Sequence, residues 1–187
     1  MKVTLLGDSI RLLGYGTKLP ELLGDDFTVF QPEENCRYSV YTLRGIFEWR
    51  DNILGSDVIH WNNGLWDICS IIEEGEPFIP LDFYLDTMER IAKELLKITP
   101  RVIFATTTPV LDGHPYDKNE LIDKYNAAVV PRLAALGVRI NDLHSLVKAH
   151  ADEYIKDDLV HLNEKGIDAA VRQVADCILD SLKCDKI

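Results

Sequence analysis

The chain reads V-T-L-L-G-D-S-I from Val3 to Ile10, and this stretch decides the fold. Residues 3–6 are apolar or β-branched, as in a short strand that is buried on both faces of a sheet. Gly7 follows them and permits a sharp turn. Ser9 is therefore expected at the carboxyl end of the first strand, where open parallel sheets bind their ligands.

This position is compatible with two roles for Ser9. A helix that begins after Ser9 would direct backbone N–H groups at an anion formed beside the serine hydroxyl. The alternative is that Ser9 only caps this helix, which is common for a serine that follows a strand.

Further along the chain, short apolar runs alternate with helical patterns. The five expected strands are Val3–Leu6, Phe27–Phe30, Val58–Trp61, Val102–Ala105 and Val138–Ile140. Such alternation is typical of parallel βαβ construction with helices on both faces of the sheet. The sequence therefore predicts one α/β domain over residues 1–187 with a five-stranded parallel sheet.

Three segments have the apolar period of helices. The first runs from Leu85 to Leu96 and is ended by Thr99-Pro100. The second covers about Lys118–Leu136, and Pro131 is expected to kink it or end it early. The last helix should begin directly after an N-cap at Asn163, and its apolar face comprises Ile167, Ala170, Val171, Val174, Ala175, Ile178, Leu179 and Leu182.

The composition limits the partners of the chain. It has 20 Lys and Arg against 31 Asp and Glu, a formal net charge of −11, which repels nucleic acid phosphates and anionic lipid headgroups. We therefore expect neither nucleic acid nor a membrane as partner. The sequence also contains no run of about 18 apolar residues, the length that could span a bilayer. A neutral small-molecule ester fits this charge better, and nothing in the sequence predicts an oligomeric state.

The N-terminal residues and the cysteines also limit the class of protein. Residues 1–15 lack the charged leader, long apolar run and cleavage site of a secretory signal, which predicts a cytoplasmic protein. The four cysteines form no CxxC pair, so their spacing suggests neither a zinc site nor a redox motif.

A second chemical motif, Asp158-Leu159-Val160-His161, lies just before the last helix. A serine hydroxyl is a weak nucleophile until an imidazole takes its proton, and that imidazole needs a carboxylate to fix its tautomer. An Asp three residues before a His can supply both groups from one loop. The alternative is that Asp158 is a solvated acid and His161 a surface residue. The other histidines have no such partner pattern and are expected in structural or surface roles; they are His60, His114, His144 and His150.

The combination of Gly7-Asp8-Ser9-Ile10 with Asp158-x-x-His161 resembles the first and last sequence blocks of the SGNH (GDSL-like) hydrolases, and the resemblance spans essentially the whole chain. It implies a flavodoxin-like three-layer α/β/α sandwich, no metal or other cofactor, and hydrolysis of carboxylic esters through an acyl-enzyme. Ser9, Asp158 and His161 would be the nucleophile, the orienting acid and the general base.

The resemblance also implies an oxyanion hole, and here the chain departs from the family pattern. The family contributes a glycine N–H after the second strand and an asparagine side chain from a GxND element after the third. The corresponding first segment, residues 34–39, contains no glycine, although another residue can supply a backbone N–H. In the second, Gly64 is followed two residues later by Trp66 in place of the asparagine. Asn62 or Asn63 can supply the missing amide, with Asn63 preferred; otherwise Asn62-Asn63-Gly64 is simply a turn.

Three side chains indicate the substrate. Arg37, Tyr38 and Trp66 would supply aromatic and hydrogen-bonding surface suited to a sugar, unless they only pack over the site. We expect an esterase that removes a small acyl group, such as acetyl, from a carbohydrate, because no long apolar segment suggests a lipid-binding cap. The alternatives are a lysophospholipase or acyl-thioesterase of the same family, and a non-catalytic member that binds an acylated glycan.

Overall fold

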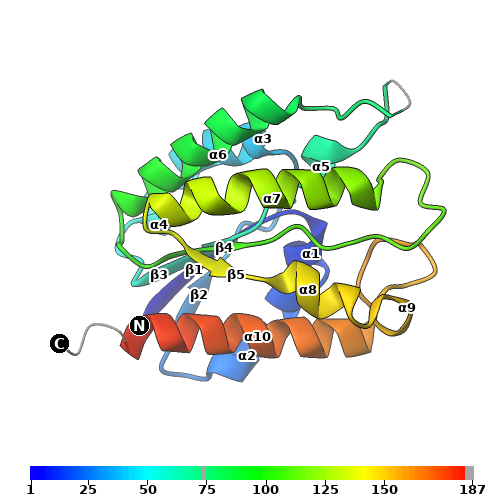
Figure 1. The fold of residues 1–187 in the computed structure, drawn as a ribbon. Helices are drawn as coiled ribbons and strands as arrows, with labels where there is room; N and C mark the ends of the chain where they lie inside the picture. Colours follow the sequence, from blue (N-terminus) through cyan, green and yellow to red (C-terminus); the bar gives the residue numbers. More distant parts are fainter. Residues whose placement is uncertain (73–74, 184–187) are drawn as a thin grey trace.

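The centre of the molecule is a five-stranded sheet with the strand order β2-β1-β3-β4-β5, all parallel. The computed structural model describes residues 1–72 and 75–183 (Figure 1). The strands are β1 (Lys2–Leu6), β2 (Thr28–Phe30), β3 (Val58–Trp61), β4 (Val102–Ala105) and β5 (Arg139–Asn141). All five predicted strands are confirmed, with ends that differ by one residue at β1, β2 and β5.

Helices cover both faces of this sheet and complete a three-layer α/β/α sandwich of the flavodoxin-like kind (Figure 1). One layer contains α3 (Ser39–Glu48), α6 (Leu81–Leu96) and α7 (Asn119–Ala135). The other contains α10 (Glu164–Lys183), which packs against α2 (Leu19–Leu23) and α8 (Leu143–Lys148). The remaining short helices are α1 (Ser9–Leu12), η1 (Tyr15–Thr17), α4 (Arg50–Ile53), α5 (Leu65–Ile68) and α9 (Ala151–Tyr154).

The strand order places a crevice beside β1. β2 pairs with one edge of β1, and β3 pairs with the opposite edge of β1. In open α/β sheets, ligands bind at such a switch point, outside the carboxyl ends of the strands. Ser9 and Asn62 follow β1 and β3 at this edge.

The helix predictions hold with one correction. α6 and α10 occur where they were expected, and the Asn163 side chain caps α10 by accepting a hydrogen bond from the Gly166 N–H at 3.1 Å. Pro131 does not end α7, which continues to Ala135. The N–H that Pro131 lacks would bond the carbonyl of Ala127, four residues earlier, so the proline removes one hydrogen bond from the preceding turn without ending the helix.

In the part of the chain that the structure describes, no helix combines the length and the hydrophobicity that crossing a bilayer requires.

Candidate active site

Ser9 begins α1, but Asp8 provides the cap of this helix. The Asp8 Oδ1 atom accepts a hydrogen bond from the Ile10 N–H at 2.9 Å. Within residues 1–72 and 75–183, neither the hydroxyl nor the backbone N–H of Ser9 has a hydrogen-bond partner. The capping role that was the alternative for Ser9 therefore belongs to Asp8, and both polar groups of Ser9 remain free.

Asp158 and His161 form a pair on the loop before α10. The Asp158 Oδ2 atom lies 2.9 Å from the His161 Nδ1 atom, and Asp158 Oδ1 accepts the backbone N–H groups of His161 and Val160. Burial acts to raise the pKa of Asp158, but these hydrogen bonds outweigh it, so the pKa lies below its ordinary value. A carboxylate that stays charged can fix the imidazole with its proton on Nδ1.

One pocket of about 430 Å³ is lined by both Ser9 and His161. Most of its wall is apolar and comes from five segments, which follow β1, β2, β3 and β4 and precede α10. The full lining is Ser9, Leu13, Asn35, Leu65, Trp66, Cys69, Ile71, His114, Tyr116, Asp117, Val160 and His161. Ser9 and His161 thus line one pocket, and Asp158 is hydrogen-bonded to the imidazole; a hydroxyl, an imidazole and a carboxylate are the groups that nucleophilic acyl transfer uses.

Several solved structures share this architecture. A lipase/acylhydrolase from Enterococcus faecalis has 18% sequence identity and a TM-score of 0.78, with 95% of this chain and 94% of that chain covered. An acetyl xylan esterase, AlAXEase, has 20% identity and a TM-score of 0.74, with 97% and 99% covered. A carbohydrate esterase of family 3 from Talaromyces cellulolyticus has 21% identity and a TM-score of 0.69, with 98% of each chain covered. The chain has the fold of the SGNH (GDSL-like) hydrolases. No protein-family model and no curated protein matches its sequence.

In this GDSL-like fold, the asparagine that the sequence favoured as oxyanion donor is not among the residues that line the pocket. Asn63 is fully buried, and its Nδ2 atom donates a hydrogen bond to the Arg37 carbonyl at 2.9 Å. Its backbone carbonyl accepts hydrogen bonds from the hydroxyls of Tyr84 and Thr107. These contacts do not support a donor role for the Asn63 side chain, because its amide N–H group is already bonded to the Arg37 carbonyl.

Asn62 has a comparable structural position. Its Nδ2 atom donates to Asp8 Oδ1 at 2.8 Å, and its Oδ1 atom accepts from the Tyr15 hydroxyl at 2.8 Å. Burial raises the pKa of Asp8. Asn62 thus connects the end of β3 to the turn that carries Ser9, and it positions that turn.

Trp66 and Asp67 occupy the last two positions of the GxND-like element. Trp66 lines the Ser9 pocket and its side chain is 39% exposed. Asp67 is buried and accepts hydrogen bonds from both the N–H and the hydroxyl of Ser39, at the start of α3. Burial raises the pKa of Asp67 to about 7. Asp67 therefore fastens α5 to the loop that follows β2.

That loop contains a donor that the sequence reasoning missed. Arg37, which was expected near the substrate, instead has its guanidinium 5.0 Å from the centre of the Tyr41 ring and does not line the Ser9 pocket. Its backbone has a φ of +49°, and its N–H donates to Asn35 Oδ1 at 2.7 Å. This bond uses the oxygen of the Asn35 amide, while Nδ2 has no partner among the described residues, and Asn35 lines the pocket with Ser9.

A buried arginine holds the same loop in place. Arg11 is fully buried, and its guanidinium donates to the carbonyls of Gly7, Pro32 and Glu34. The first of these carbonyls belongs to the Ser9 turn and the other two to the Asn35 loop. Arg11 therefore fixes these two segments relative to each other.

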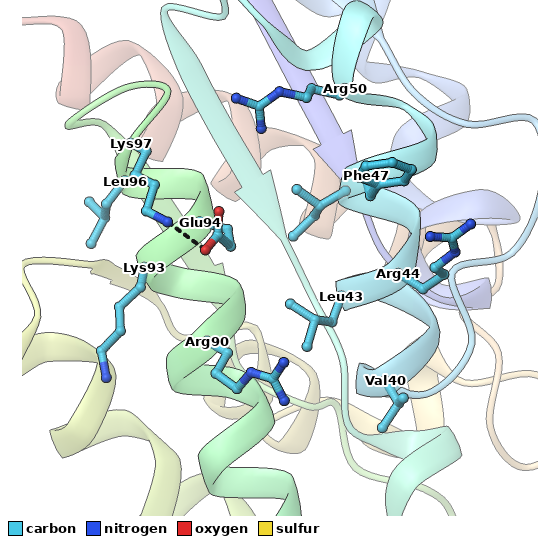
Figure 2. Close-up of a pocket in the computed structure, with 11 residues that line it drawn as sticks. Val40, Leu43, Arg44, Phe47, Arg50, Arg90, Lys93, Glu94, Leu96 and Lys97 are labelled. Atoms are coloured by element: carbon cyan, nitrogen blue, oxygen red, sulfur yellow. Dashed lines mark hydrogen bonds and ion pairs between the residues drawn. The ribbon is translucent and has the colours of Figure 1, made fainter.

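A larger hollow of about 1010 Å³ lies elsewhere, between α3 and α6, where Figure 2 shows Leu43 and Arg90 extending into the space between the helices. Five basic side chains line it, namely Arg44, Arg50, Arg90, Lys93 and Lys97. Neither Ser9 nor His161 reaches this hollow, so it is separate from the candidate active site.

Proposed function

We propose that the protein is a serine hydrolase that cleaves carboxylic esters through an acyl-enzyme. The observation that carries the proposal is the shared pocket of Ser9 and His161, with Asp158 hydrogen-bonded to the far side of the imidazole. The similar structures are described as an acylhydrolase and as carbohydrate esterases, which agrees with this chemistry.

In the proposed reaction, the Ser9 hydroxyl attacks the ester carbonyl while His161 Nε2 takes its proton. His161 then gives that proton to the leaving alcohol, and Asp158 stabilises the imidazolium that forms between these steps. Water attacks the acyl-enzyme with His161 again as base, which releases the acid and restores Ser9.

Two donors are proposed for the oxyanion. The Ser9 backbone N–H stands at the start of α1 and has no partner in the described chain. The second is the Asn35 Nδ2 group, since Asn35 supplies the side-chain amide in the pocket lining. Donors that are already oriented before the reaction stabilise the developing charge without any reorganisation.

The substrate that we propose is a small acyl group, such as acetyl, on a carbohydrate. Trp66 and Tyr116 line the pocket and present aromatic surface of the kind that packs against sugar rings. A second candidate is an ester with a longer acyl chain, because Leu13 and Ile71 line the same pocket and are about half exposed, at 53% and 52%. A series of p-nitrophenyl esters of increasing acyl length separates the two, since an acetylesterase loses activity as the chain grows.

The direct test of the proposed function is labelling with a fluorophosphonate probe, together with hydrolysis of p-nitrophenyl acetate. The wild-type protein should be labelled at Ser9, and Ser9→Ala should lose labelling and at least about 10³-fold in turnover. Ser145→Ala, at an exposed serine on α8, is the matched control and should behave like wild type. An unlabelled wild-type protein would instead indicate a non-catalytic member that binds its ligand.

A further inference from the structure

The Ser9 pocket contains a second histidine and aspartate besides the proposed triad. His114 and Asp117 lie between β4 and α7, and both line the pocket. They are only 9% and 6% exposed, so of the structural and surface roles expected for His114 the surface role does not apply. A polar pair of this kind is unusual in a wall that is otherwise mostly apolar, because buried polar groups are costly unless they find partners.

The segment that carries this pair is fixed to the rest of the site by backbone hydrogen bonds. The Leu111 N–H donates to the Leu159 carbonyl at 2.8 Å, which joins the segment to the loop of Asp158 and His161. The Ser70 N–H donates to the Tyr116 carbonyl at 2.8 Å, which joins it to the segment after α5. The position of the pair relative to the triad is therefore set by the fold.

The hydrogen bonds of the pair leave one donor and one acceptor unused. The Asp117 N–H donates to His114 Nδ1 at 3.0 Å, so a neutral His114 ring carries its proton on Nε2. Asp117 Oδ2 lies 3.2 Å from the same Nδ1 atom. Asp117 Oδ1 is buried without a hydrogen-bond partner in the described chain. The hydrogen bond of the pocket-lining His114 ring is made through Nδ1, which leaves Nε2 open to a ligand. A buried polar atom without a partner calls for a ligand or another explanation.

The electrostatics of the pair favour a neutral ligand. Burial raises the pKa of Asp117 to about 7, and the negative charge of Asp8 adds to this effect. Burial also lowers the pKa of His114. His114 thus favours its neutral form near neutral pH, whereas the neutral and charged forms of Asp117 are both populated there, and in either form the pair offers an N–H donor and an oxygen acceptor. A hydroxyl group, which both donates and accepts, is the smallest neutral partner that satisfies both.

We propose that His114 and Asp117 form a hydroxyl-binding subsite, which selects esters that carry a free hydroxyl near the scissile bond, as in partly acylated sugars. The subsite rests on the proposed ester hydrolase function and assigns its specificity to these two residues. Tyr116, whose ring is 6.1 Å from that of His114 and edge-on to it, lies beside the subsite and supplies apolar surface for the ring that carries the hydroxyl.

The test compares two substrates that differ only in whether their hydroxyls are free. One is a monoacetylated methyl xyloside, and the other is the same ester with its free hydroxyls capped as methyl ethers. Wild type should prefer the free hydroxyl at least about tenfold in kcat/KM, because a site that hydrogen-bonds a hydroxyl rejects an analogue without it. Asp117→Ala should remove most of this preference, because it should lower kcat/KM much more on the ester with free hydroxyls than on the capped ester.

Two further variants guard against a merely structural effect. Asp117→Asn keeps the Oδ1 acceptor and should retain most of the preference. Asp112→Ala removes an exposed carboxylate from the same segment and should change nothing. An equal loss on both sugar esters, or a loss of preference in Asp112→Ala, would overturn the subsite.

Failure of the subsite and failure of the hydrolase function give different results. If Ser9 is not labelled and no ester is cleaved, the proposed function has failed. Binding of the uncleaved monoacetylated xyloside, followed by NMR line broadening, then tests the subsite alone. Weaker binding to Asp117→Ala than to wild type supports it, and equal binding refutes it.

Discussion

At the scale of single residues, the proposed reactive groups are available for chemistry because neighbouring side chains make the hydrogen bonds that hold the helix start and the loops in place. Asp8 caps α1 and leaves Ser9 without a hydrogen-bond partner in the described chain. Asp158 accepts two backbone N–H groups on one oxygen and holds His161 with the other. Asn62 and Asn63 brace the surrounding loops, whereas Asn35 uses only its oxygen and keeps its N–H groups available.

The first prediction at this scale separates Asn35 from Asn63. Asn35→Ala should lower kcat by about 10²-fold or more and change KM little, since an oxyanion donor acts mainly in the transition state. Asn63→Ala should leave kcat within about threefold of wild type but cost about 1–3 kcal/mol of stability, because it leaves the Arg37 carbonyl without its donor. Steady-state kinetics and urea unfolding of the two variants measure these effects. The reverse pattern would restore Asn63 as the donor that the sequence favoured.

At the scale of the elements, the loops after β2, β3 and β4 are joined to one another by hydrogen bonds. Asp67 joins α5 to the start of α3, and the Thr107 hydroxyl donates to the Asn63 carbonyl. Gly64 stands between them, with a φ of +156°. A Cβ atom at this position would lie 1.9 Å from Thr107 Oγ1, so only glycine fits here without displacing the loop after β4.

The prediction for this element is that Gly64→Ala destabilises the protein by more than about 3 kcal/mol, since backbone strain of about 1–3 kcal/mol adds to a steric overlap. Gly55→Ala is the matched control: Gly55 also has a positive φ, +77°, but nothing lies within 4 Å of a Cβ there. It should cost only the strain. Thermal and urea unfolding give both values, and Thr107→Ala should partly rescue Gly64→Ala. Equal costs for the two glycines would show that the overlap is unimportant.

At the scale of the whole molecule, the sheet itself carries a buried titratable group. His60 lies on β3 at the centre of the sheet and is fully buried, and its Nε2 atom is 3.1 Å from Asn141 Nδ2 on β5. Burial lowers the pKa of His60 to about 3. The folded protein therefore keeps this ring neutral at a pH where the unfolded chain would charge it.

The corresponding prediction concerns stability at acid pH. Between the ordinary histidine pKa of about 6.5 and the folded value of about 3, the unfolded chain binds a proton at His60 and the folded chain does not. This contribution to stability is complete above that range and is lost as the pH falls through it. His60→Gln should therefore show a weaker loss of stability than wild type between pH 7 and pH 4 in urea unfolding, although it is less stable at pH 7. His150→Gln, at an exposed histidine, is the control. An identical pH dependence in wild type and His60→Gln would contradict the prediction.

The sequence by itself determined the sheet, the last helix and the chain order of the proposed triad. Buried strands and amphipathic helices reveal themselves through local apolar patterns, which do not depend on distant contacts. The pairing of Asp158 with His161 is also local, because the two residues lie three positions apart on one loop. Pro131 shows the limit of such local rules, since α7 continues past it to Ala135.

Only the tertiary structure decided which polar side chains face the pocket. The Asn63 amide donates its hydrogen bond to the carbonyl of Arg37, 26 residues earlier in the chain. The Asn62 amide donates to the carboxylate of Asp8, 54 residues earlier. The position of His114 and Asp117 beside the proposed triad depends on the backbone hydrogen bond from the Leu111 N–H to the Leu159 carbonyl. The physical reason is that an amide or imidazole looks the same in the sequence whether its hydrogen bonds are satisfied or free, and its partners come from segments that meet only when the sheet has formed.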